Sequence, residues 1–168
     1  MSEVHKFYIK GHEVLIDKDK VELVIKYTWY IVKKSKKCKS NYFWIGANAK
    51  INGNWTIIKL HRLLMNAKEG QIVDHINRNT FDNRLCNLRF ATHRQNSVNT
   101  NSRSNSSSNY LGVSIDVKGY KIPRFRSQIH TGNKVLNLGS FVSEIEAAKA
   151  YNEAAIKYHG EFANLNKI

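Results

Sequence analysis

The most informative part of the chain is the stretch HRLLMNAKEGQIVDHINRNTFDNRLCNLRFATHRQNSVN, which spans residues 61–99. Within it, the apolar pair Ile72-Val73 leads into Asp74 and His75, which predicts a strand that ends in two groups able to bind metals or protons. Residues 87–91, with the sequence NLRFA, predict a returning strand. The loop between the two strands is rich in residues that favour turns, namely Asn77, Asn79, Asp82 and Asn83.

A helix is predicted directly after this hairpin. The pattern Thr92-His-Arg-Gln95 is a capping box, in which the Thr side chain bonds a backbone N–H and the Gln side chain reaches back. The helix then begins at about His93, and Asn96 lies one turn into it. A hairpin followed by such a helix can fold Asn96 back onto the strand end that carries Asp74 and His75.

These residue types suit the hydrolysis of a phosphodiester bond. Water attacks the phosphorus while charge builds on the phosphate and on the leaving oxygen, and one divalent cation can stabilise both. Mg²⁺ keeps several waters and takes one or two protein oxygens, so Asp74 and Asn96 would suffice. A neutral His75 can accept the proton of the attacking water. Because neighbouring residues of a strand point to opposite faces, Asp74 can hold the cation while His75 faces the water.

The same stretch resembles the HNH endonucleases, and most closely the phage-type homing enzymes with Asn at the last signature position. The matching segments are Val73-Asp74-His75-Ile-Asn77, Asp82-Asn83-Arg84, Asn87-Leu88-Arg89, Gln95-Asn96 and Asn99, preceded by His61-Arg62-Leu63-Leu64. Members of this family bind one divalent ion in a ββα-metal motif, so the resemblance implies one Mg²⁺ or Mn²⁺ ion. Many relatives also carry zinc-binding cysteine pairs, and because this chain has none, no structural zinc is expected.

The resemblance also implies a role for each site residue. Asp74 and Asn96 would be the metal ligands, and His75 would be the general base. Asn87 would be the middle signature residue, whose hydrogen bonds fix the loop so that His75 is oriented. DNA contacts from this stretch are expected at His61, Arg62 and Arg89.

Taken singly, these residues allow plainer interpretations. Asp74 could cap a turn, and His75 could be a buried histidine with satisfied hydrogen bonds. Asp82 could stabilise an Asx turn or act as an acid beside the site. The joint spacing of Asp74, His75, Asn87 and Asn96 favours the catalytic interpretation.

The end of the chain predicts a compact module of three strands and one helix. Strands are predicted over residues 110–118, 124–130 and 134–141. Pro123 lacks a backbone donor, so the second strand is expected to begin late or to bulge. Ser143 and Glu146 form a second capping box, and Gly160 is placed to end the helix that follows.

This module resembles the plant ethylene-response-factor, or Apetala-two-like, DNA-binding domain. The matching segments are Leu111-Gly112-Val113-Ser114, Phe125-Arg126-Ser127-Gln128-Ile129, Leu138-Gly139-Ser140-Phe141 and the helix from Ala147 to Tyr158. Phe125 stands where that family usually has Trp. The family lays its three-stranded sheet in the major groove of double-stranded DNA, and it is known as a fusion partner of HNH nucleases in phages and bacteria.

Alternation along the second strand separates two faces of this sheet. Ser127 and Ile129 would face the helix, whereas Arg124, Arg126 and Gln128 would face away from it. Two arginines and a glutamine on one face favour contacts with bases and phosphates, and a merely solvated polar face is the alternative.

The charge of the chain favours a polyanionic partner. Of its 168 residues, 27 are Lys or Arg and 13 are Asp or Glu, which gives a formal net charge of +14. The excess is +7 over residues 1–60, +3 over 61–100 and +4 over 101–168, so no single tail explains it. Several surfaces are therefore expected to face one extended anion such as double-stranded DNA. A basic surface kept for solubility is the alternative.

Four segments in an α+β fold are predicted. Residues 1–60 form a basic, strand-rich N-terminal region, and residues 61–99 form the nuclease core. Residues 100–109 are almost all Ser and Asn, which predicts a linker. Arg103 would lie against the phosphate backbone, although a plain tether is the alternative. Residues 110–168 form the DNA-binding module.

Within the N-terminal region, short strands and one helix are expected. A hairpin is predicted around Gly11, and Asp17 begins a segment of helical spacing that continues to Trp29. Further strands are predicted near residues 29–33, 42–47 and 55–60.

Other features limit the class of protein. No run of the chain approaches the ~18 apolar residues that a membrane span needs, and the start, MSEVHKFYIKGHEV, lacks the apolar core of a signal peptide. Cys38 and Cys86 are expected to be free thiols. A cytoplasmic protein associated with the nucleoid of a bacterial or phage-infected cell is expected, without a membrane or an obligatory protein partner.

Together these features predict a site-specific, divalent-metal-dependent DNA endonuclease, and in particular a homing enzyme. One copy of the motif predicts that a monomer nicks one strand. A transcription-factor-like DNA-binding protein with an inactive nuclease motif is the non-enzymatic alternative, and an RNA-processing nuclease is a third hypothesis.

Overall fold

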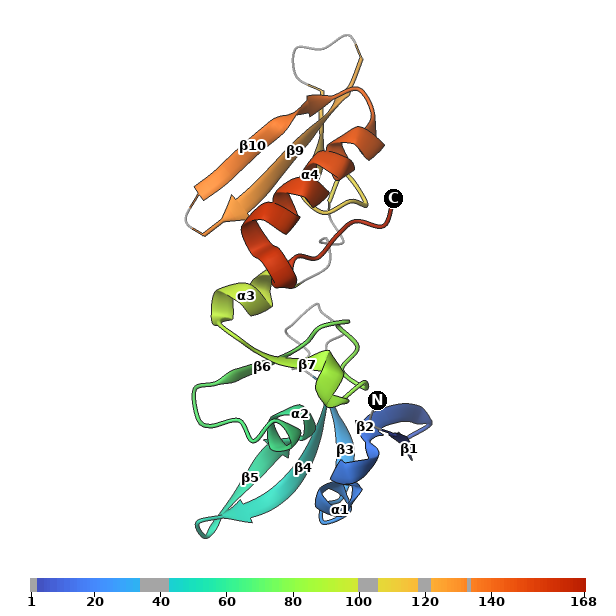
Figure 1. The fold of residues 1–168 in the computed structure, drawn as a ribbon, viewed down its shortest axis with the longest axis vertical. Coiled ribbons are helices and arrows are strands. Elements are labelled where there is room, and N and C mark those ends of the chain that lie inside the picture. Colours follow the sequence, from blue (N-terminus) through green and yellow to red (C-terminus); the bar gives the residue numbers. More distant parts are fainter. Residues whose placement is uncertain (1–2, 34–42, 100–105, 118–121, 133) are drawn as a thin grey trace. The chain divides into compact units, whose positions relative to one another are not determined.

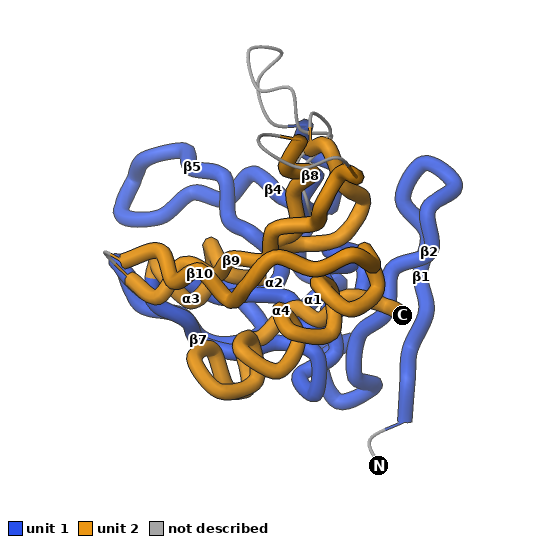
Figure 2. The backbone as a smooth tube through the Cα atoms, turned by 90° about the horizontal axis from the view of Figure 1, so that it is seen from above, with its two compact units in different colours: residues 1–92 blue, residues 93–168 orange. Residues whose placement is uncertain are grey.

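A computed structural model of the chain describes residues 3–33, 43–99, 106–117, 122–132 and 134–168. The fold is α+β, as the sequence predicts, with small antiparallel sheets and a few helices (Figure 1). The chain divides into two compact units, residues 1–92 and 93–168 (Figure 2). The finer division into four segments stays a prediction. Within the described ranges, no helix is long and apolar enough to span a membrane.

Three small antiparallel sheets make up the first unit. The N-terminal hairpin pairs β1 (Val4–Ile9) with β2 (His12–Asp17), and a later hairpin pairs β6 (Ile72–His75) with β7 (Leu88–Ala91). The middle sheet has the order β3-β4-β5, with the bounds Trp29–Lys33, Phe43–Ile51 and Asn54–Lys59. Short helical segments connect the strands, namely η1 (Lys18–Lys20), α1 (Val21–Val24), α2 (Leu60–Leu64) and η2 (Leu85–Asn87).

One apolar core joins these sheets. Ile16 of β2 and Ile45 of β4 are fully buried, because alternate side chains of a strand point to the same side. Leu60 of α2 is fully buried in the same cluster. Val73 of β6 and Leu88 of β7 belong to the same cluster. The hairpin that carries Asp74 and His75 is therefore supported by the core of the whole unit.

The prediction of helix from Asp17 to Trp29 is wrong for the residues after Val24. The segment forms only η1 and the single turn α1. Val24 is buried, whereas Ile25 next to it is 67% exposed. The indole N–H of Trp29 donates a hydrogen bond of 2.8 Å to the Val24 carbonyl. The same carbonyl also accepts the Tyr27 backbone N–H at 3.2 Å, so it is satisfied without a longer helix, and the chain continues into β3.

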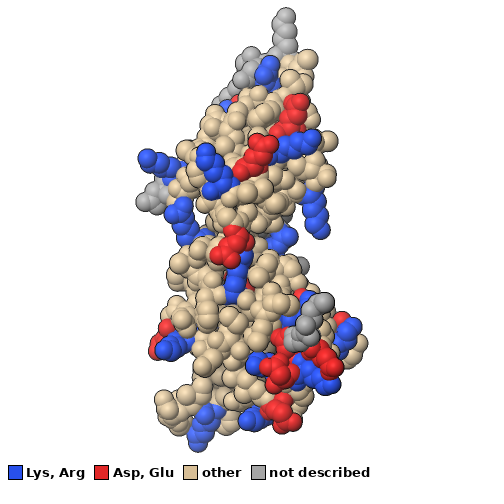
Figure 3. All heavy atoms as spheres, viewed as in Figure 1, with Lys and Arg blue, Asp and Glu red and all other residues tan. Residues whose placement is uncertain are grey.

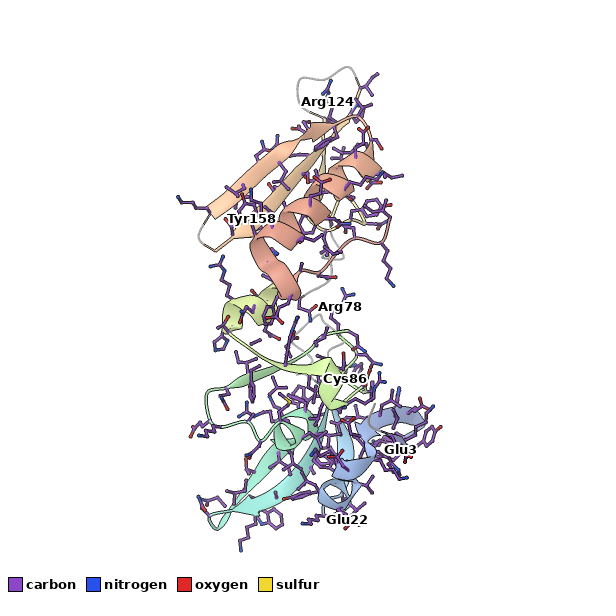
Figure 4. All side chains as sticks on the ribbon, viewed as in Figure 1. Glu3, Glu22, Arg78, Cys86, Arg124 and Tyr158 are labelled. Carbon is purple, nitrogen blue, oxygen red and sulfur yellow. The ribbon has the colours of Figure 1, made fainter. Side chains whose placement is uncertain are left out.

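The end of β5 differs by one residue from the prediction, and one of the two cysteines can be described. The strand predicted to reach Leu60 ends at Lys59, because the buried Leu60 already begins α2. Cys86 is a free, exposed thiol on η2 (Figure 4), and Cys38 lies outside the described residues.

The second unit begins with α3 (His93–Val98) and contains a sheet of order β10-β9-β8. The strands are β8 (Val113–Asp116), β9 (Arg124–Thr131) and β10 (Lys134–Phe141), followed by α4 (Glu144–His159) and η3 (Gly160–Phe162). Helix α4 packs against the sheet, and Ser127 and Ile129 are buried there while Arg126 is exposed. The predicted separation of the two faces is confirmed.

Close approach of α4 to the sheet depends on small residues. Ala147 and Ala155 are fully buried on the helix. Gly112, with φ +71°, lies under Tyr151, and an added Cβ would be 2.1 Å from the Tyr151 ring. Only glycine fits that position.

The ends of β9 and α4 were predicted with mixed success. β9 begins at Arg124, directly after Pro123, as expected for a residue without a backbone donor. The helix begins after Ser143, but in the described structure the Ser143 side chain forms no capping hydrogen bond, so the second capping box is wrong. Glu144, the first helical residue, instead accepts a 2.7 Å hydrogen bond from the Ser108 hydroxyl. Gly160, with φ +55°, follows the end of α4 as predicted.

Candidate active site

Asp74 and His75 lie at the end of β6, and both residues are buried. Pairing with β7 places Asp74 opposite Arg89. The two neighbours have different partners, because adjacent side chains of a strand point to opposite faces. Asp74 contacts Arg89, whereas His75 contacts Asn83 and His61. The fold thus separates a buried carboxylate from a buried imidazole, as the sequence predicts.

The Asp74 carboxylate is engaged by Arg89. Nε and Nη2 of Arg89 both donate to Oδ2 of Asp74, at 3.1 and 3.0 Å. The two side chains are only 12% and 8% exposed, so water screens this ion pair weakly. Arg89, which was expected to contact DNA, is therefore held by the carboxylate that was expected to bind the metal.

Asn83 fixes the tautomer of His75. Its amide Nδ2 donates to the Thr80 carbonyl at 3.0 Å, so its Oδ1 is the atom that faces Nε2 of His75, at 3.2 Å. An amide oxygen only accepts hydrogen bonds, so Nε2 carries the hydrogen and the lone pair of the neutral ring lies on Nδ1. This positioning role of Asn83, which is 1% exposed, was missed from the sequence.

Burial also keeps His75 neutral. It lowers the pKa of the imidazole below the usual 6.5, while the hydrogen bond to Asn83 and the charges of Asp74 and Asp82 act in the opposite direction. The ring is therefore unprotonated at Nδ1 at neutral pH, which is the state that a general base requires.

His61, on α2, packs against His75. The two ring centroids are 5.1 Å apart and the planes meet at 68°. Burial, followed by the nearby His75, Lys59 and Arg62, lowers the pKa of His61 to about 3. At neutral pH this ring carries no positive charge for a phosphate. Its described contact is with the candidate base, and its predicted contact with DNA stays a prediction.

Asn87 fastens the loop that follows β6. Its Oδ1 accepts the Asn77 backbone N–H at 3.0 Å, and its Nδ2 donates to the Asn77 side chain at 3.0 Å and to the Asp82 carbonyl at 2.7 Å. The loop is therefore held at both ends of its turn. The predicted orienting role remains a prediction, and these bonds would exert it through the loop, since the direct partner of His75 is Asn83.

A pair of charges stiffens the same loop. Arg84 donates through Nε and Nη2 to the two oxygens of Asp82, both at 2.7 Å, and Asn77 donates to Asp82 at 2.9 Å. The hydrogen bonds from Arg84 lower the pKa of Asp82. These contacts give Asp82 a role in holding the loop together.

The loop is also attached to the N-terminal hairpin. The Leu15 N–H donates to the Phe81 carbonyl at 2.9 Å, and the Leu15 carbonyl accepts the Asn83 N–H at 2.8 Å. Asp17, which is 3% exposed, accepts a hydrogen bond of 2.6 Å from the Leu85 N–H. The two residues are 68 positions apart in the chain. No local pattern in the sequence indicates these contacts, and they were not predicted.

Arg62 is occupied by the backbone of the segment after α2. Its guanidinium donates to the carbonyls of Gln71, Lys68 and Ala67, the second of these at 2.8 Å. These bonds give Arg62 a structural role in ordering this segment. Its predicted DNA contact stays a prediction.

The other predicted metal ligand belongs to the second unit. Asn96 lies on α3 and is exposed. Its pairing with Asp74 therefore stays a prediction. Among the described residues, no three His, Cys, Asp or Glu side chains gather to hold a metal ion by themselves. A buried carboxylate such as Asp74 nevertheless suits Mg²⁺, which takes only one or two protein oxygens.

On the second unit, the predicted DNA-contacting residues lie on β9. Arg126 is exposed and donates to the carboxylate of Asp116 on β8. Arg124, at the start of β9 (Figure 4), is paired with Asp116 in the register of the sheet. Gln128 lies on the same face and is partly buried. Arg103 lies outside the described residues.

Comparisons with known proteins identify the family of the chain. A family model described as HNH endonuclease matches residues 59–98. An uncharacterised HNH endonuclease of Acanthamoeba polyphaga mimivirus is 34% identical over 166 residues, which cover 95% of this chain and 77% of the relative. No solved structure gives a significant match. With its buried Asp74-His75 pair on a strand of the matched region, the chain belongs to the HNH endonuclease family and is a nuclease.

Proposed function

We propose that the chain is a site-specific DNA endonuclease that hydrolyses a phosphodiester bond with the help of one divalent metal ion. The observation that carries the proposal is the buried pair at the end of β6, a carboxylate beside a neutral imidazole whose tautomer is set by Asn83. HNH nucleases generally use a divalent metal, and Mg²⁺, or Mn²⁺ in its place, is the ion that this oxygen-based site would take.

Each residue has a defined part in the proposed reaction. Nδ1 of His75 accepts a proton from the water that attacks the phosphorus. Asp74 and Asn96 would hold the ion, which supplies positive charge to stabilise the phosphate and the leaving oxygen. Asn87 keeps the loop in place, and through it the backbone that carries His75 and Asn83.

The second unit would hold DNA beside the cleavage site. Its three-stranded sheet with one helix supports the resemblance to the Apetala-two-like domain, which is proposed here as a major-groove reader. Arg124, Arg126 and Gln128 would contact bases and phosphates from one face of β9. Arg103 would lie along the backbone between the two modules, which would act as a tethered clamp.

The biological role that we propose is homing. One copy of the motif implies that a monomer nicks one strand of double-stranded DNA. The expected setting is the cytoplasm of a bacterial or phage-infected cell, at the nucleoid.

A plasmid assay tests the proposal. Supercoiled DNA is incubated with the protein and Mg²⁺ or Mn²⁺, with EDTA as the metal-free control. Conversion to the nicked form that needs metal and is lost in Asp74→Ala supports the enzyme. If the protein binds the plasmid but does not nick it with any metal tested, the transcription-factor-like alternative is supported. If it cleaves competing RNA in preference to the plasmid, the RNA-processing alternative is supported.

A further inference from the structure

The middle sheet of the first unit has one face in the core and one face in solvent. Ile45 and Ala47 of β4 are buried on the inner side. The register pairs Lys50 with Trp55 and Gly46 with Lys59, so these residues lie on the opposite side. We call this side the outer sheet face. Its larger side chains are Tyr30, Trp44, Lys50, Trp55, Ile57 and Lys59.

Large apolar side chains are exposed on the outer sheet face. Trp55 is 74% exposed and Ile57, two residues along the same strand, is 50% exposed. Single exposed apolar residues are common, but a tryptophan and an isoleucine side by side on one strand form a patch that water solvates poorly. Such a patch is typical of a binding surface.

Side chains of the two neighbouring strands meet over Gly46 at the centre of the outer sheet face. An added Cβ on Gly46 would lie 2.9 Å from Val32 and 3.0 Å from Ile57, which shows that these two side chains close over the glycine from either side. The Tyr30 hydroxyl donates to Asn48 at 2.8 Å and is held in place by that bond. A sheet face without a side chain at its centre can lie against an extended partner.

The described strands of the middle sheet carry charge of one sign. Strands β3, β4 and β5 contain Lys33, Lys50 and Lys59 and no Asp or Glu. The ammonium of Lys59 lies 5.2 Å from the centre of the Trp44 ring, and Lys50 is exposed beside Trp55. On the face shown in Figure 3, most of the acidic side chains of this unit gather over the N-terminal hairpin and α1, and the tip of the β4–β5 hairpin shows Lys without them.

We propose that the outer sheet face binds duplex DNA that flanks the cleavage site. Lys50 and Lys59 contact phosphates, and Trp55 and Ile57 pack against sugars and base edges in a groove. Positive charge on strands that carry no Asp or Glu favours a polyanion over a protein partner, and a second copy of this chain would bring the same charge against itself. The inference rests on the proposed function, since it assigns the DNA of that reaction a second contact.

Equilibrium binding of the full chain to a random-sequence duplex, in EDTA and at several salt concentrations, tests this inference. In Trp55→Ala the affinity should fall about tenfold with an unchanged salt dependence, because an apolar contact is lost. In the double variant Lys50→Ala/Lys59→Ala the slope of log affinity against log salt should become shallower by about 2, because two phosphate contacts are lost.

Matched controls come from the N-terminal hairpin. Tyr8 is 67% exposed on β1, and Lys6 is paired with Glu13 at 3.0 Å, so Tyr8→Ala and Lys6→Ala should leave affinity and slope unchanged. Thermal unfolding should be unaltered in Trp55→Ala, because the side chain is exposed. Sedimentation and competition with single-stranded DNA or RNA accompany the binding assay.

The outcomes separate this inference from the proposed function. If Trp55→Ala and the double lysine variant bind the duplex like the unaltered chain, or if Trp55→Ala converts a dimer into a monomer, the inference is wrong. The inference is also wrong if the competition assay shows that single-stranded DNA or RNA binds the outer sheet face more tightly than the duplex does. Metal-dependent plasmid nicking by the unaltered chain would stand in each case, so a failed surface would leave the nuclease proposal intact.

Discussion

Arg89 and Asp74 form a buried ion pair across the β6–β7 hairpin, in which Nε and Nη2 of Arg89 share one carboxylate oxygen. The carboxylate proposed to hold the metal thus already has a cationic partner. Two positive charges compete for Asp74 whenever a divalent ion is present. The arginine can also bind a phosphate of DNA, because its guanidinium suits both anions.

Removing Arg89 should therefore strengthen metal binding in the absence of DNA. In Arg89→Gln we expect the affinity for Mn²⁺, measured by calorimetry or by electron paramagnetic resonance, to rise about tenfold, which corresponds to the loss of roughly one competing charge-assisted contact. Nicking should become slower, since the variant cannot contact the phosphate.

Two controls accompany this variant. Asp74→Asn should lose Mn²⁺ binding. Breaking a buried ion pair costs about 3–5 kcal/mol of stability, so circular dichroism is needed to check that Arg89→Gln is still folded. Unchanged or weaker Mn²⁺ binding in folded Arg89→Gln would show that the pair does not limit access to Asp74.

Asn83 should control the tautomer and the pKa of His75, and through them the rate of nicking. In Asn83→Ala, Nε2 of His75 loses its acceptor, and we expect nicking to slow by about 10- to 100-fold. Asn83→Asp keeps an acceptor but adds a negative charge, which raises the pKa of His75, so the rise of activity with pH should shift to higher pH. Nitrogen NMR of the imidazole should show hydrogen at Nε2 in the unaltered chain. Hydrogen at Nδ1 would contradict this assignment.

His61 should make the fold sensitive to acid. Its pKa in the folded chain is about 3, against the usual 6.5, so below pH 6.5 the unfolded chain takes up a proton that the folded chain refuses. The free energy of unfolding is therefore highest above pH 6.5 and falls as the pH decreases. In His61→Phe, the loss of stability between pH 7 and pH 5 should shrink by about 2 kcal/mol in urea unfolding.

The matched control for this measurement is His130→Phe, because His130 is exposed on β9. It should leave the acid sensitivity as it is. Equal acid sensitivity in His61→Phe and the unaltered chain would show that His61 does not carry the effect.

The N-terminal hairpin should matter for catalysis through Asp17. In Asp17→Ala, the partly buried Leu85 N–H loses its acceptor, which should cost about 1 kcal/mol of stability and slow nicking by loosening the loop. Asp17→Asn retains an acceptor oxygen and should behave close to the unaltered chain. If Asp17→Ala nicks DNA at the unaltered rate and unfolds at the same urea concentration, the hairpin has no such supporting role.

The local parts of this structure followed from the sequence. The β6–β7 hairpin, the start of β9 after Pro123 and the end of α4 before Gly160 are set by residues close to one another in the chain. Apolar alternation along β9 also separated Ile129 from Arg126 correctly. Such features depend on strand periodicity and on the special backbone of proline and glycine, which a sequence displays directly.

Contacts between distant segments did not follow from the sequence. The bond from Leu85 to Asp17 and the pairing of Leu15 with Asp82 join the candidate site to a hairpin early in the chain. The tautomer of His75 depends on which atom of Asn83 faces it, and that is set in turn by Thr80. The end of α1 was not predicted either, although it is local: the Trp29 indole donates to the Val24 carbonyl five residues earlier, where the helical spacing of the sequence still continued.

We propose above all that His75 is the base of a metal-dependent nuclease. The most direct test is the first-order rate constant for nicking of supercoiled DNA in Mg²⁺, compared between the unaltered chain and His75→Ala at equal concentrations of folded protein. We expect the rate to be at least about 100-fold lower in the variant, since general-base catalysis contributes about that much. Nicking by folded His75→Ala at the unaltered rate would contradict it.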